Sequence, residues 1–205
     1  VARGFPRLGL RCEAVHPPEH LRPEAGALVP RVDLQDLLEG PAGYDGVEIE
    51  RARERESSAQ LGVRYGVGTA TDLARFPDDS FDLVVAVFLF NYLNVDESLQ
   101  AMTEIRRVLK SGGNFVFAVP HPSMPFLRNE EPPFYFSRGD AGYFSGRNNQ
   151  MEGKIWRRDG RAVSVRCAHK TLEDYFFCLR QAGFSRIPEI RELHVTSDIV
   201  EIDPA

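Results

Sequence analysis

Residues 76–93 read FPDDSFDLVVAVFLFNYL, and the unbroken apolar run at 83–90 decides the fold class. This run is too short to cross a membrane, because a spanning helix takes about 20 apolar residues. Its length suits a strand that is buried on both faces, which is the pattern of a central strand in a parallel sheet. We therefore predict a fold that is organised around a buried parallel strand.

The two segments that follow predict a helix and a second strand. Apolar residues recur at helical spacing within 95–110, at Leu99, Met102, Ile105 and Leu109. We expect this helix to end at the pair Gly112-Gly113, since glycine readily adopts the left-handed backbone that closes a helix. The apolar segment 114–120 then predicts a strand, and a right-handed crossover would make it parallel to the first.

Ligands of such sheets bind beyond the carboxyl ends of the strands. The first predicted strand is followed by Asn91 and Tyr92, and the second is followed by His121 and Pro122. The strand-helix-strand unit therefore predicts a ligand site that contains these residues.

The segments FDLV at 81–84 and LKSGG at 109–113 resemble, in their order and spacing, two strand signatures of class I S-adenosylmethionine-dependent methyltransferases of the small-molecule type. The resemblance extends to GTATDL at 68–73 and to GVEI at 46–49. It implies an α/β, Rossmann-like fold with a mostly parallel, doubly wound sheet. It also implies S-adenosyl-L-methionine as the cofactor.

Length and composition narrow the remaining possibilities. A chain of 205 residues with 42% hydrophobic content can bury one core, so we expect a single domain over 1–205. The net charge of -5 argues against a nucleic-acid or anionic-membrane partner, because both bind concentrated positive charge. The three cysteines lack C-x-x-C spacing, so we expect no disulfide framework, no metal site and a reducing, cytoplasmic location.

Residues 1–43 are atypical, because prolines interrupt them too often for a long helix. A short strand or one or two helical turns are the alternatives at 30–38. Methyltransferases of this class carry a glycine-rich turn in this region, where the backbone approaches the cofactor. Gly40 and Gly43 are candidates for that turn, but Pro41 lies between them and their spacing differs from the family's.

Residues 47–49 predict a short second strand, with Gly46 before it and Glu48 near its carboxyl end. A carboxylate there can accept hydrogen bonds from both ribose hydroxyls of a nucleoside, so we assign Gly46 and Glu48 to cofactor binding. A solvated glutamate in a run of alternating charges is the alternative for Glu48.

A third strand is expected at 63–67, and Thr69 and Ala70 follow it. The resemblance implies that the Thr69 hydroxyl and the Ala70 backbone N–H contact the adenine ring, although relatives usually carry an aspartate in place of Thr69. A simple turn is the alternative. Phe90 and Asn91 complete the predicted cofactor contacts, because aromatic faces stabilise cations such as a sulfonium; core packing is the alternative for Phe90.

Four residues are candidates for substrate contact or catalysis. His121 is the predicted general base, because histidine accepts a proton near neutral pH; a pocket-lining role is its alternative. Tyr92, Tyr135 and Phe144 are predicted to contact the substrate together with His121. We expect these aromatic side chains to favour a hydrophobic acceptor.

Aromatic residues crowd 126–144 among prolines and glycines, a composition that is too aromatic for a disordered segment. We predict that residues 123–168 form a small aromatic-rich cap over the ligand site; packing against a partner subunit is the alternative. The Asp159-Gly160 pair between extended segments predicts a β-hairpin within this cap.

The carboxyl third predicts a helix and then a strand. Thr171 and Asp174 resemble a capping box, and we expect the helix that they begin to end at Gly183. Its spacing predicts four inward-facing residues, Leu172, Tyr175, Phe176 and Leu179. Residues 186–195 predict a sixth strand. Residues 198–205 are short and polar for the family's seventh strand, so incomplete termini are an open alternative.

The leading hypothesis is a transferase that moves a methyl group by in-line displacement to O or N of a small-molecule acceptor. Positioning would supply much of the acceleration, with proton removal by His121 or water, in a monomer or homodimer. A catalytically inactive methyltransferase-like binding or interaction module is the alternative, favoured by the missing glycine-rich turn. A nicotinamide-dependent oxidoreductase is disfavoured, since no G-x-G-x-x-G motif follows the first strand.

Overall fold

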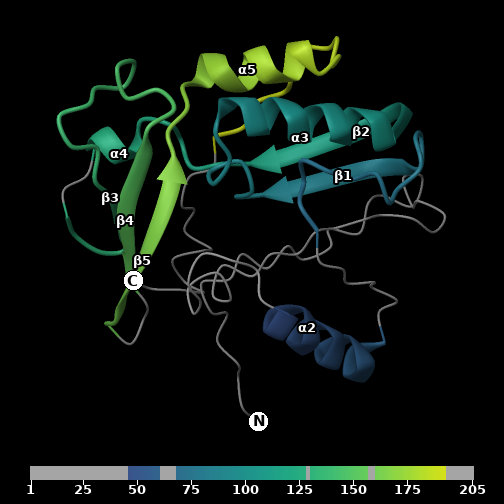
Figure 1. Ribbon diagram of the computed structural model, residues 1–205, viewed down its shortest axis with the longest axis horizontal. Helices are drawn as coiled ribbons and strands as arrows, with labels where there is room; N and C mark the ends of the chain where they lie inside the picture. Colours follow the sequence, from purple (N-terminus) through teal and green to yellow (C-terminus); the bar gives the residue numbers. More distant parts are fainter. Residues whose placement is uncertain (1–45, 61–67, 128–129, 157–159, 193–205) are drawn as a thin grey trace.

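The computed structural model describes residues 46–60, 68–127, 130–156 and 160–192. Strands β1 (Phe81–Val87) and β2 (Leu109–Ala118) form a parallel pair, and both point toward a second, three-stranded sheet (Figure 1). The strand predicted at 63–67 lies outside the described residues, as do the strand or helical turns considered at 30–38, the amino-terminal turn and residues 198–205.

The predicted parallel pairing of the two apolar strands is confirmed. Val84 lies opposite Phe115 and Val85 opposite Val116, and the register shifts near the start of β1. Strand β1 ends at Val87, earlier than the apolar run, because Phe88 has a φ of 55°. A positive φ at a phenylalanine cannot continue a strand, so the chain turns there toward the predicted ligand site.

Helix α3 (Val95–Val108) confirms the predicted amphipathic helix. It begins at a capping box in which the Asn94 side chain accepts from the Glu97 backbone, while the Glu97 carboxylate accepts from the Asn94 backbone. Asp96 and Glu97 in its first turn and arginines in its last turn suit the helix dipole. This helix joins the carboxyl end of β1 to the start of β2.

The predicted end of this helix at the glycine pair is wrong. Strand β2 starts directly at Leu109, which pairs with Phe81. The glycines instead lie in the irregular part of β2: Gly112 has a φ of 81°, and a side chain on Gly113 would come within 3.1 Å of the Asp82 carbonyl oxygen. They therefore allow β2 to kink against β1.

Helix α5 (Leu172–Gln181) confirms the capping box, since Thr171 and Asp174 cap each other's backbone N–H groups. Gly183, with a φ of 91°, follows its end as predicted. Of the four residues predicted to face inward, Tyr175 and Leu179 are buried, whereas Leu172 and Phe176 are exposed. The correct inward stripe uses Cys178 in place of those two, because α5 packs on α3 rather than flat on the sheet.

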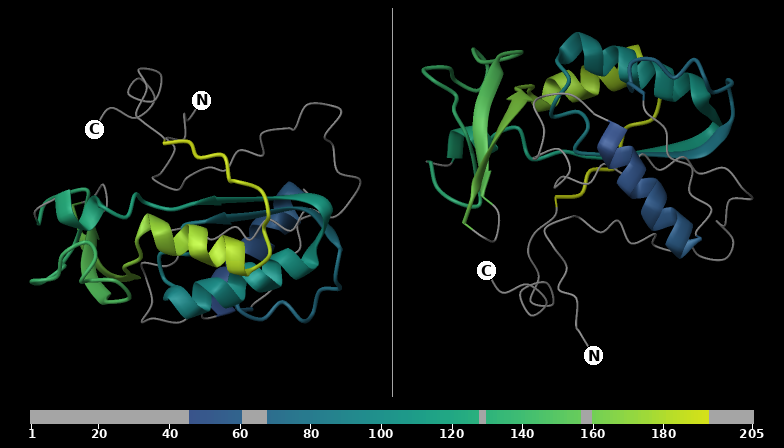
Figure 2. Two further views of the ribbon diagram at one scale, coloured as in Figure 1. Left: turned by 90° about the horizontal axis from the view of Figure 1, so that it is seen from above. Right: turned by 60° about the horizontal axis from the view of Figure 1, so that its bottom comes forward.

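Helices α3 and α5 cover one face of the β1–β2 pair, as Figure 2 shows. The core lies between the β1–β2 pair and these two helices. It consists mainly of apolar side chains from β1, α3 and α5: Phe81, Val84, Met102, Ile105, Tyr175 and Leu179. Phenylalanine rings from β2 also pack against this core. Burial of these side chains is the main source of stability for β1, β2, α3 and α5, which we call the parallel unit.

The predicted β-hairpin is confirmed by the antiparallel strands β4 (Gln150–Trp156) and β5 (Ala162–Ala168). Gly160 has a φ of 80°, the conformation for which glycine is suited in a hairpin turn. Strand β3 (Phe134–Phe136) pairs with β4, so a third strand extends the hairpin. The short helix α4 (Met124–Leu127) comes between β2 and this three-stranded sheet, which we call the cap sheet after the cap predicted at 123–168.

The second strand predicted at 47–49 is wrong, because these residues belong to helix α2 (Gly46–Ala59). Only three residues there have a strand-like pattern, whereas the glutamates, arginines and alanines that follow favour a helix. The helix therefore extends backward through Glu48. None of the helices among the described residues is long and apolar enough to cross a membrane.

The sixth strand predicted at 186–195 is wrong for the part that the structure describes. Residues 186–192 contain no strand, and residues 193–195 lie outside the described ranges. Pro188 explains the failure, since proline cannot donate to a strand ladder. Ile187, beside it, is 94% exposed rather than packed in a sheet.

Candidate functional site

The candidate site lies where β1 and β2 end and where the cap sheet begins (Figure 1). Loop 88–94 leaves β1, and the segment after β2 leads through Pro120 to His121. Asn91 and Tyr92 are half-buried, and His121 is exposed. The topology thus brings three of the predicted site residues to one edge of the molecule.

Loop 91–95 is hydrogen-bonded to the base of the cap sheet. The backbone N–H of Ala168, the last residue of β5, donates to the Asn91 carbonyl over 2.7 Å. The backbone N–H of Val95 donates to Oδ1 of Asn148 over 2.9 Å. Asn148 in turn donates its backbone N–H to the His169 carbonyl over 2.8 Å. These bonds connect the parallel unit with the cap sheet at the site itself.

A buried lysine reinforces this connection. The Lys170 ammonium donates to the Leu93 carbonyl and, over 3.0 Å, to the Ala168 carbonyl. It also lies 5.7 Å from the centre of the Tyr175 ring. Burial lowers the pKa of Lys170 to about 8, because the ammonium loses its hydration.

An ion pair lies close to this lysine at the start of α5. Nε of Arg147 lies 2.5 Å from Oδ1 of the buried Asp174, whose other oxygen accepts from the Thr171 backbone and hydroxyl. Burial raises the pKa of Asp174, but hydrogen bonds from Thr171 and Arg147 outweigh it and hold that pKa below its ordinary value. Both oxygens of the Asp174 carboxylate therefore have hydrogen-bond partners, and these bonds fix the start of α5.

His121 is held by its neighbours rather than by the core. Its Nδ1 lies 2.7 Å from Oγ of Ser123 and accepts the Ser123 backbone N–H over 3.2 Å. Its Nε2 lies 3.8 Å from Oε1 of Glu192, and 43% of its side chain is exposed. Because the backbone N–H must be a donor, Nδ1 is the acceptor and the neutral ring carries its proton on Nε2.

The turn that contains Thr69 is anchored to the middle of α3. Thr69 Oγ1 lies 2.8 Å from Thr71 Oγ1, and the Gln100 side chain donates to the Thr71 carbonyl over 3.0 Å. The Leu73 backbone N–H donates to Glu104 over 2.9 Å. The Thr69 turn therefore lies beside the middle of α3.

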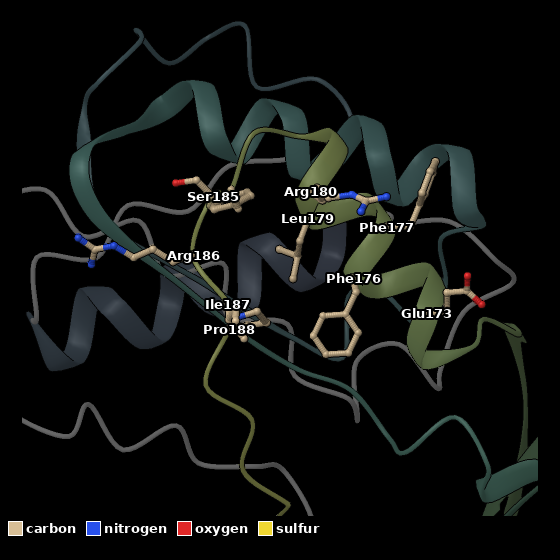
Figure 3. Close-up of a pocket in the computed structure, with 10 residues that line it drawn as sticks. Glu173, Phe176, Phe177, Leu179, Arg180, Ser185, Arg186, Ile187 and Pro188 are labelled. Carbon is tan, nitrogen blue, oxygen red and sulfur yellow. The ribbon is translucent and has the colours of Figure 1, made fainter.

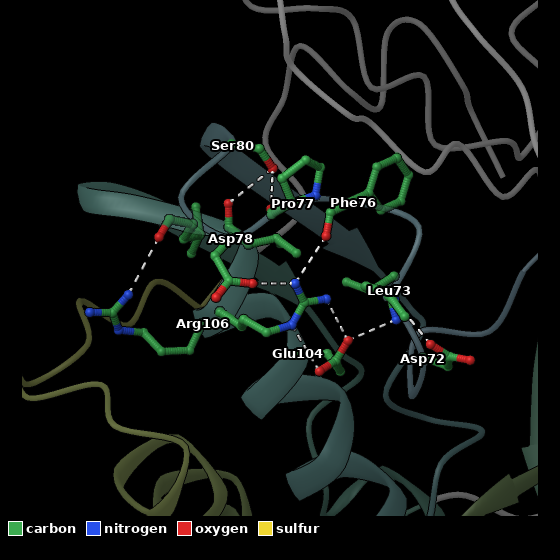
Figure 4. Close-up of polar contacts among 12 residues, drawn as sticks. Asp72, Leu73, Phe76, Pro77, Asp78, Ser80, Glu104 and Arg106 are labelled. Atoms are coloured by element: carbon green, nitrogen blue, oxygen red, sulfur yellow. Dashed lines mark hydrogen bonds and ion pairs between the residues drawn. The ribbon is translucent and has the colours of Figure 1, made fainter.

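Arg107, in the last turn of α3, holds residues 72–80 in place through the contacts drawn in Figure 4. Nη1 of Arg107 lies 2.7 Å from Oδ1 of Asp78 and donates to the Phe76 carbonyl over 2.9 Å. Its Nε and Nη2 donate to the Glu104 carboxylate over 3.1 and 2.8 Å. The hydrogen bond from Arg107 lowers the pKa of Glu104, although burial opposes it. The network therefore ties residues 72–80 to α3.

Phe90 does not line a pocket among the described residues. Its side chain is 0% exposed and packs edge-to-face on Phe115 and Phe117, with ring centres 6.0 and 5.4 Å away. Core packing, the alternative for this residue, is thus what the structure shows. The helical conformation at Gly46 and Glu48 likewise removes the strand end on which their assignment depended.

The cap contains an aromatic cluster formed by Phe126, Tyr143, Phe144 and His169. Adjacent rings meet edge-to-face with centres 5.0 to 5.9 Å apart. His169 is buried, and one ring nitrogen lies 2.8 Å from the Tyr143 carbonyl oxygen. Burial lowers the pKa of His169, so this ring is mainly neutral at pH 7.

The predicted substrate residues of the cap lie apart from each other. Phe144 belongs to the cluster and is 77% exposed. Tyr135 lies on β3, half-buried and opposite Lys154. Tyr135 on β3 and Phe144 in the aromatic cluster therefore lie in different parts of residues 123–168.

A surface pocket of about 380 Å³ lies along α5 and the chain that follows it (Figure 3). Its lining is mainly apolar and includes Phe176, Phe177, Leu179, Phe184, Ile187 and Pro188. Arg180 and Arg186 also line it. This pocket contains none of the predicted site residues.

Sequence reasoning missed Ser123, His169 and Lys170. Ser123 could have been found, since a hydroxyl two residues after a histidine can reach its ring. His169 and Lys170 gave no such signal, because a histidine and a lysine before a capping box usually face solvent. Their burial arises from the packing of β5 against loop 91–95.

Residues 43–117 match the family model of a methyltransferase domain. A curated relative, the demethylmenaquinone methyltransferase of Leptospira interrogans serogroup Icterohaemorrhagiae serovar copenhageni, is 34% identical over 96 residues. That match covers 47% of this chain and 36% of the relative. The chain therefore spans little more than a third of the curated relatives that it matches.

Solved structures support the fold. The PH0226 protein from Pyrococcus horikoshii OT3 superposes with a TM-score of 0.51 and 21% identity, over 66% of this chain and 60% of that one. An S-adenosylmethionine-dependent methyltransferase from Clostridium acetobutylicum ATCC 824 gives a TM-score of 0.50 and 16% identity, over 67% and 60%. These similarities indicate a Rossmann-like α/β fold for the parallel unit.

Proposed function

Because this chain carries a domain of the class I S-adenosylmethionine-dependent methyltransferase family, we propose that it transfers a methyl group to O or N of a small molecule. The observation that carries this proposal is the convergence of Asn91, Tyr92 and His121 at the carboxyl ends of β1 and β2. Parallel sheets bind their ligands at that edge.

The described residues fit part of the cofactor. Thr69 exposes a hydroxyl suited to a base or ribose, and Asn91 lies in the loop after β1 with both a donor and an acceptor. S-adenosylmethionine, when bound, would supply an electrophilic methyl group. Glu48, Gly46 and Ala70 remain predicted cofactor contacts.

We assign the proton-accepting role to Nδ1 of His121. The Ser123 backbone N–H favours a lone pair on that nitrogen, and Ser123 Oγ is 2.7 Å away. An acceptor hydroxyl or amine beside Ser123 could pass its proton to Oγ while Oγ passes its own to Nδ1. The resulting imidazolium would be stabilised by the Glu192 carboxylate, 3.8 Å from Nε2.

The acceptor is proposed to be hydrophobic or aromatic. The cap presents the exposed Phe144 ring next to Tyr143, and Arg138 lies 5.8 Å from the Phe126 ring. Aromatic side chains bind apolar ring systems through large contact areas. Tyr92 and Tyr135 remain predicted substrate contacts.

A screen for methyl transfer tests this function. Purified protein would be incubated with methyl-labelled S-adenosylmethionine and a panel of small phenols, hydroxylated heterocycles and amines. We expect labelled product from at least one aromatic acceptor, and a loss in His121→Ala of roughly 10²-fold or more. Cofactor binding without transfer to any class of acceptor would favour the inactive binding module instead.

A further inference from the structure

Lys170 is a charged side chain in the protein interior that has no chemical role in the proposed function. It is 2% exposed, and its ammonium donates to the carbonyls of Leu93 and Ala168. A buried ammonium loses its hydration at a large cost, so it is stable only with such partners. The position of these partners indicates what the side chain does.

The two carbonyls belong to different parts of the fold. Leu93 lies in the loop after β1, and Ala168 is the last residue of β5 in the cap sheet. The backbone N–H of Ala168 already donates to Asn91 over 2.7 Å. The hydrogen bonds of the Lys170 side chain thus lie next to a backbone hydrogen bond. Both connect the cap sheet with the loop that carries Asn91 and Tyr92.

The same loop is fixed at its far end by a second part of the cap. Oδ1 of Asn148 accepts the Val95 backbone N–H over 2.9 Å, and the Val95 carbonyl lies 3.6 Å from Sγ of Cys178. Asn148 has a φ of 68° and is itself bonded to the His169 carbonyl. Loop 91–95 is therefore held at both ends by residues that adjoin Lys170 in sequence or space.

We propose that Lys170 is a positioning residue that fixes loop 91–94 against the base of the cap sheet and so holds Asn91 and Tyr92 ready for ligand. The ligand's identity rests on the proposed function, but the tie formed by these hydrogen bonds does not. An apolar side chain at this position would leave the Leu93 and Ala168 carbonyls without this donor. A side-chain donor that reaches both carbonyls at once connects loop 91–94 with the end of β5.

Amide hydrogen exchange measured by NMR, without ligand, tests the tie. The wild type would be compared with Lys170→Met, which keeps length but loses the donors, and with Lys170→Arg, which keeps charge and donors. Lys154→Met is the matched control, because Lys154 is an exposed lysine of the same cap sheet that pairs with Glu130. The reporter amides are those of Ala168 and Val95.

In Lys170→Met we expect both reporter amides to exchange about tenfold faster or more, while the amides of Met102 and Ile105 in α3 change little. Lys170→Arg should restore part of the protection, and Lys154→Met should leave it unchanged. Unchanged reporters, or equal acceleration in α3, would overturn the proposal. If Lys170→Met does not fold, the wild type decides. Its Ala168 amide must exchange within about tenfold of the β2 amides, and a rate 100-fold faster would overturn the tie.

Titration with S-adenosylhomocysteine then tests the consequence for ligand binding. We expect Lys170→Met to bind about tenfold more weakly than the wild type and Lys154→Met to bind equally well. A loosened loop with unchanged affinity would contradict the positioning role. Absence of binding by the wild type would instead count against the proposed function, and the exchange result would stand on its own.

Discussion

The Ala168 backbone N–H donates to the Asn91 carbonyl over 2.7 Å, which joins the cap sheet to the carboxyl end of β1. Together with the Lys170 hydrogen bonds to the Leu93 and Ala168 carbonyls, this bond connects β5 with loop 88–94. Through these bonds, a change in the cap is transmitted to residues that we propose contact the cofactor.

His121 and Ser123 should have separable effects on methyl transfer. His121→Ala is expected to lower kcat by roughly 10²-fold to 10⁴-fold, because the proton acceptor is lost. Ser123→Ala should lower kcat less, by about tenfold, since water can replace the hydroxyl. Steady-state kinetics on an accepted substrate measures both. Equal rates in His121→Ala and the wild type would show that water takes the proton.

Gly153→Ala should disrupt the cap sheet. A Cβ on Gly153 would lie 2.4 Å from the Tyr135 carbonyl oxygen and 2.4 Å from the Phe136 ring, so β3 and β4 could not keep their register. We expect a loss of about 1–3 kcal/mol in the free energy of unfolding. Fluorescence of Trp156, the single tryptophan, would shift to longer wavelength as the cap opens.

Gly142→Ala is the matched control for that substitution. Its Cβ would meet only Ser145 Oγ, at 3.4 Å, and Gly142 lies in the same cap. We expect unchanged Trp156 fluorescence and a change in unfolding free energy within about 0.5 kcal/mol. Similar effects of the two alanines would contradict the crowding at Gly153.

Arg107→Met should destabilise the parallel unit more than Arg106→Met on the same helix. Arg107 bonds to the Phe76 carbonyl and to the carboxylates of Asp78 and Glu104, whereas Arg106 donates to the Leu109 carbonyl over a longer 3.4 Å. Thermal unfolding of both variants measures the difference. A larger fall in Tm for Arg106→Met would contradict the network.

Lys170 should make stability rise with pH between 8 and 9. Burial lowers its pKa from 10.5 to about 8, so in this range the unfolded chain holds more protons than the folded protein. Stability therefore increases with pH, by about 1 kcal/mol over that unit. Cys167 contributes with the opposite sign, because burial raises its pKa from 9.0 to about 11, so the folded protein holds more protons than the unfolded chain between these values.

Urea denaturation at pH 8 and pH 9 tests this sign. The wild type should gain stability relative to Lys170→Met as the pH rises, and Lys154→Met should follow the wild type. Parallel curves for the wild type and Lys170→Met would show that the ammonium is not desolvated as the structure has it.

Local sequence signals predicted much of the fold. The Thr171–Asp174 capping box, the turn at Gly160 and the parallel pairing of β1 with β2 depend on neighbouring residues or on a continuous apolar run. Each of these patterns favours a single backbone conformation. They were therefore correct at or near the residues predicted.

The errors concern residues whose structure depends on distant partners. Residues 47–49 resembled a strand, but the charged segment after them extends a helix through them. The position of Phe90 after a buried strand predicted a ligand contact. In the structure the chain turns at Phe88, which has a positive φ, and the Phe90 ring packs against Phe115. The burial of Lys170 required knowledge of which carbonyls lie beside it. Such contacts are set by tertiary packing, which residue spacing alone does not encode.

We propose that this domain binds S-adenosylmethionine at the edge of the molecule that carries Asn91. Calorimetric titration with S-adenosylhomocysteine tests it most directly, with Asn91→Ala as the site variant and Asn149→Ala, in the cap, as the matched control. We predict micromolar binding by the wild type and the control, and binding weakened by about tenfold in Asn91→Ala. No heat of binding from folded wild type, or equal affinity in Asn91→Ala, would contradict this account.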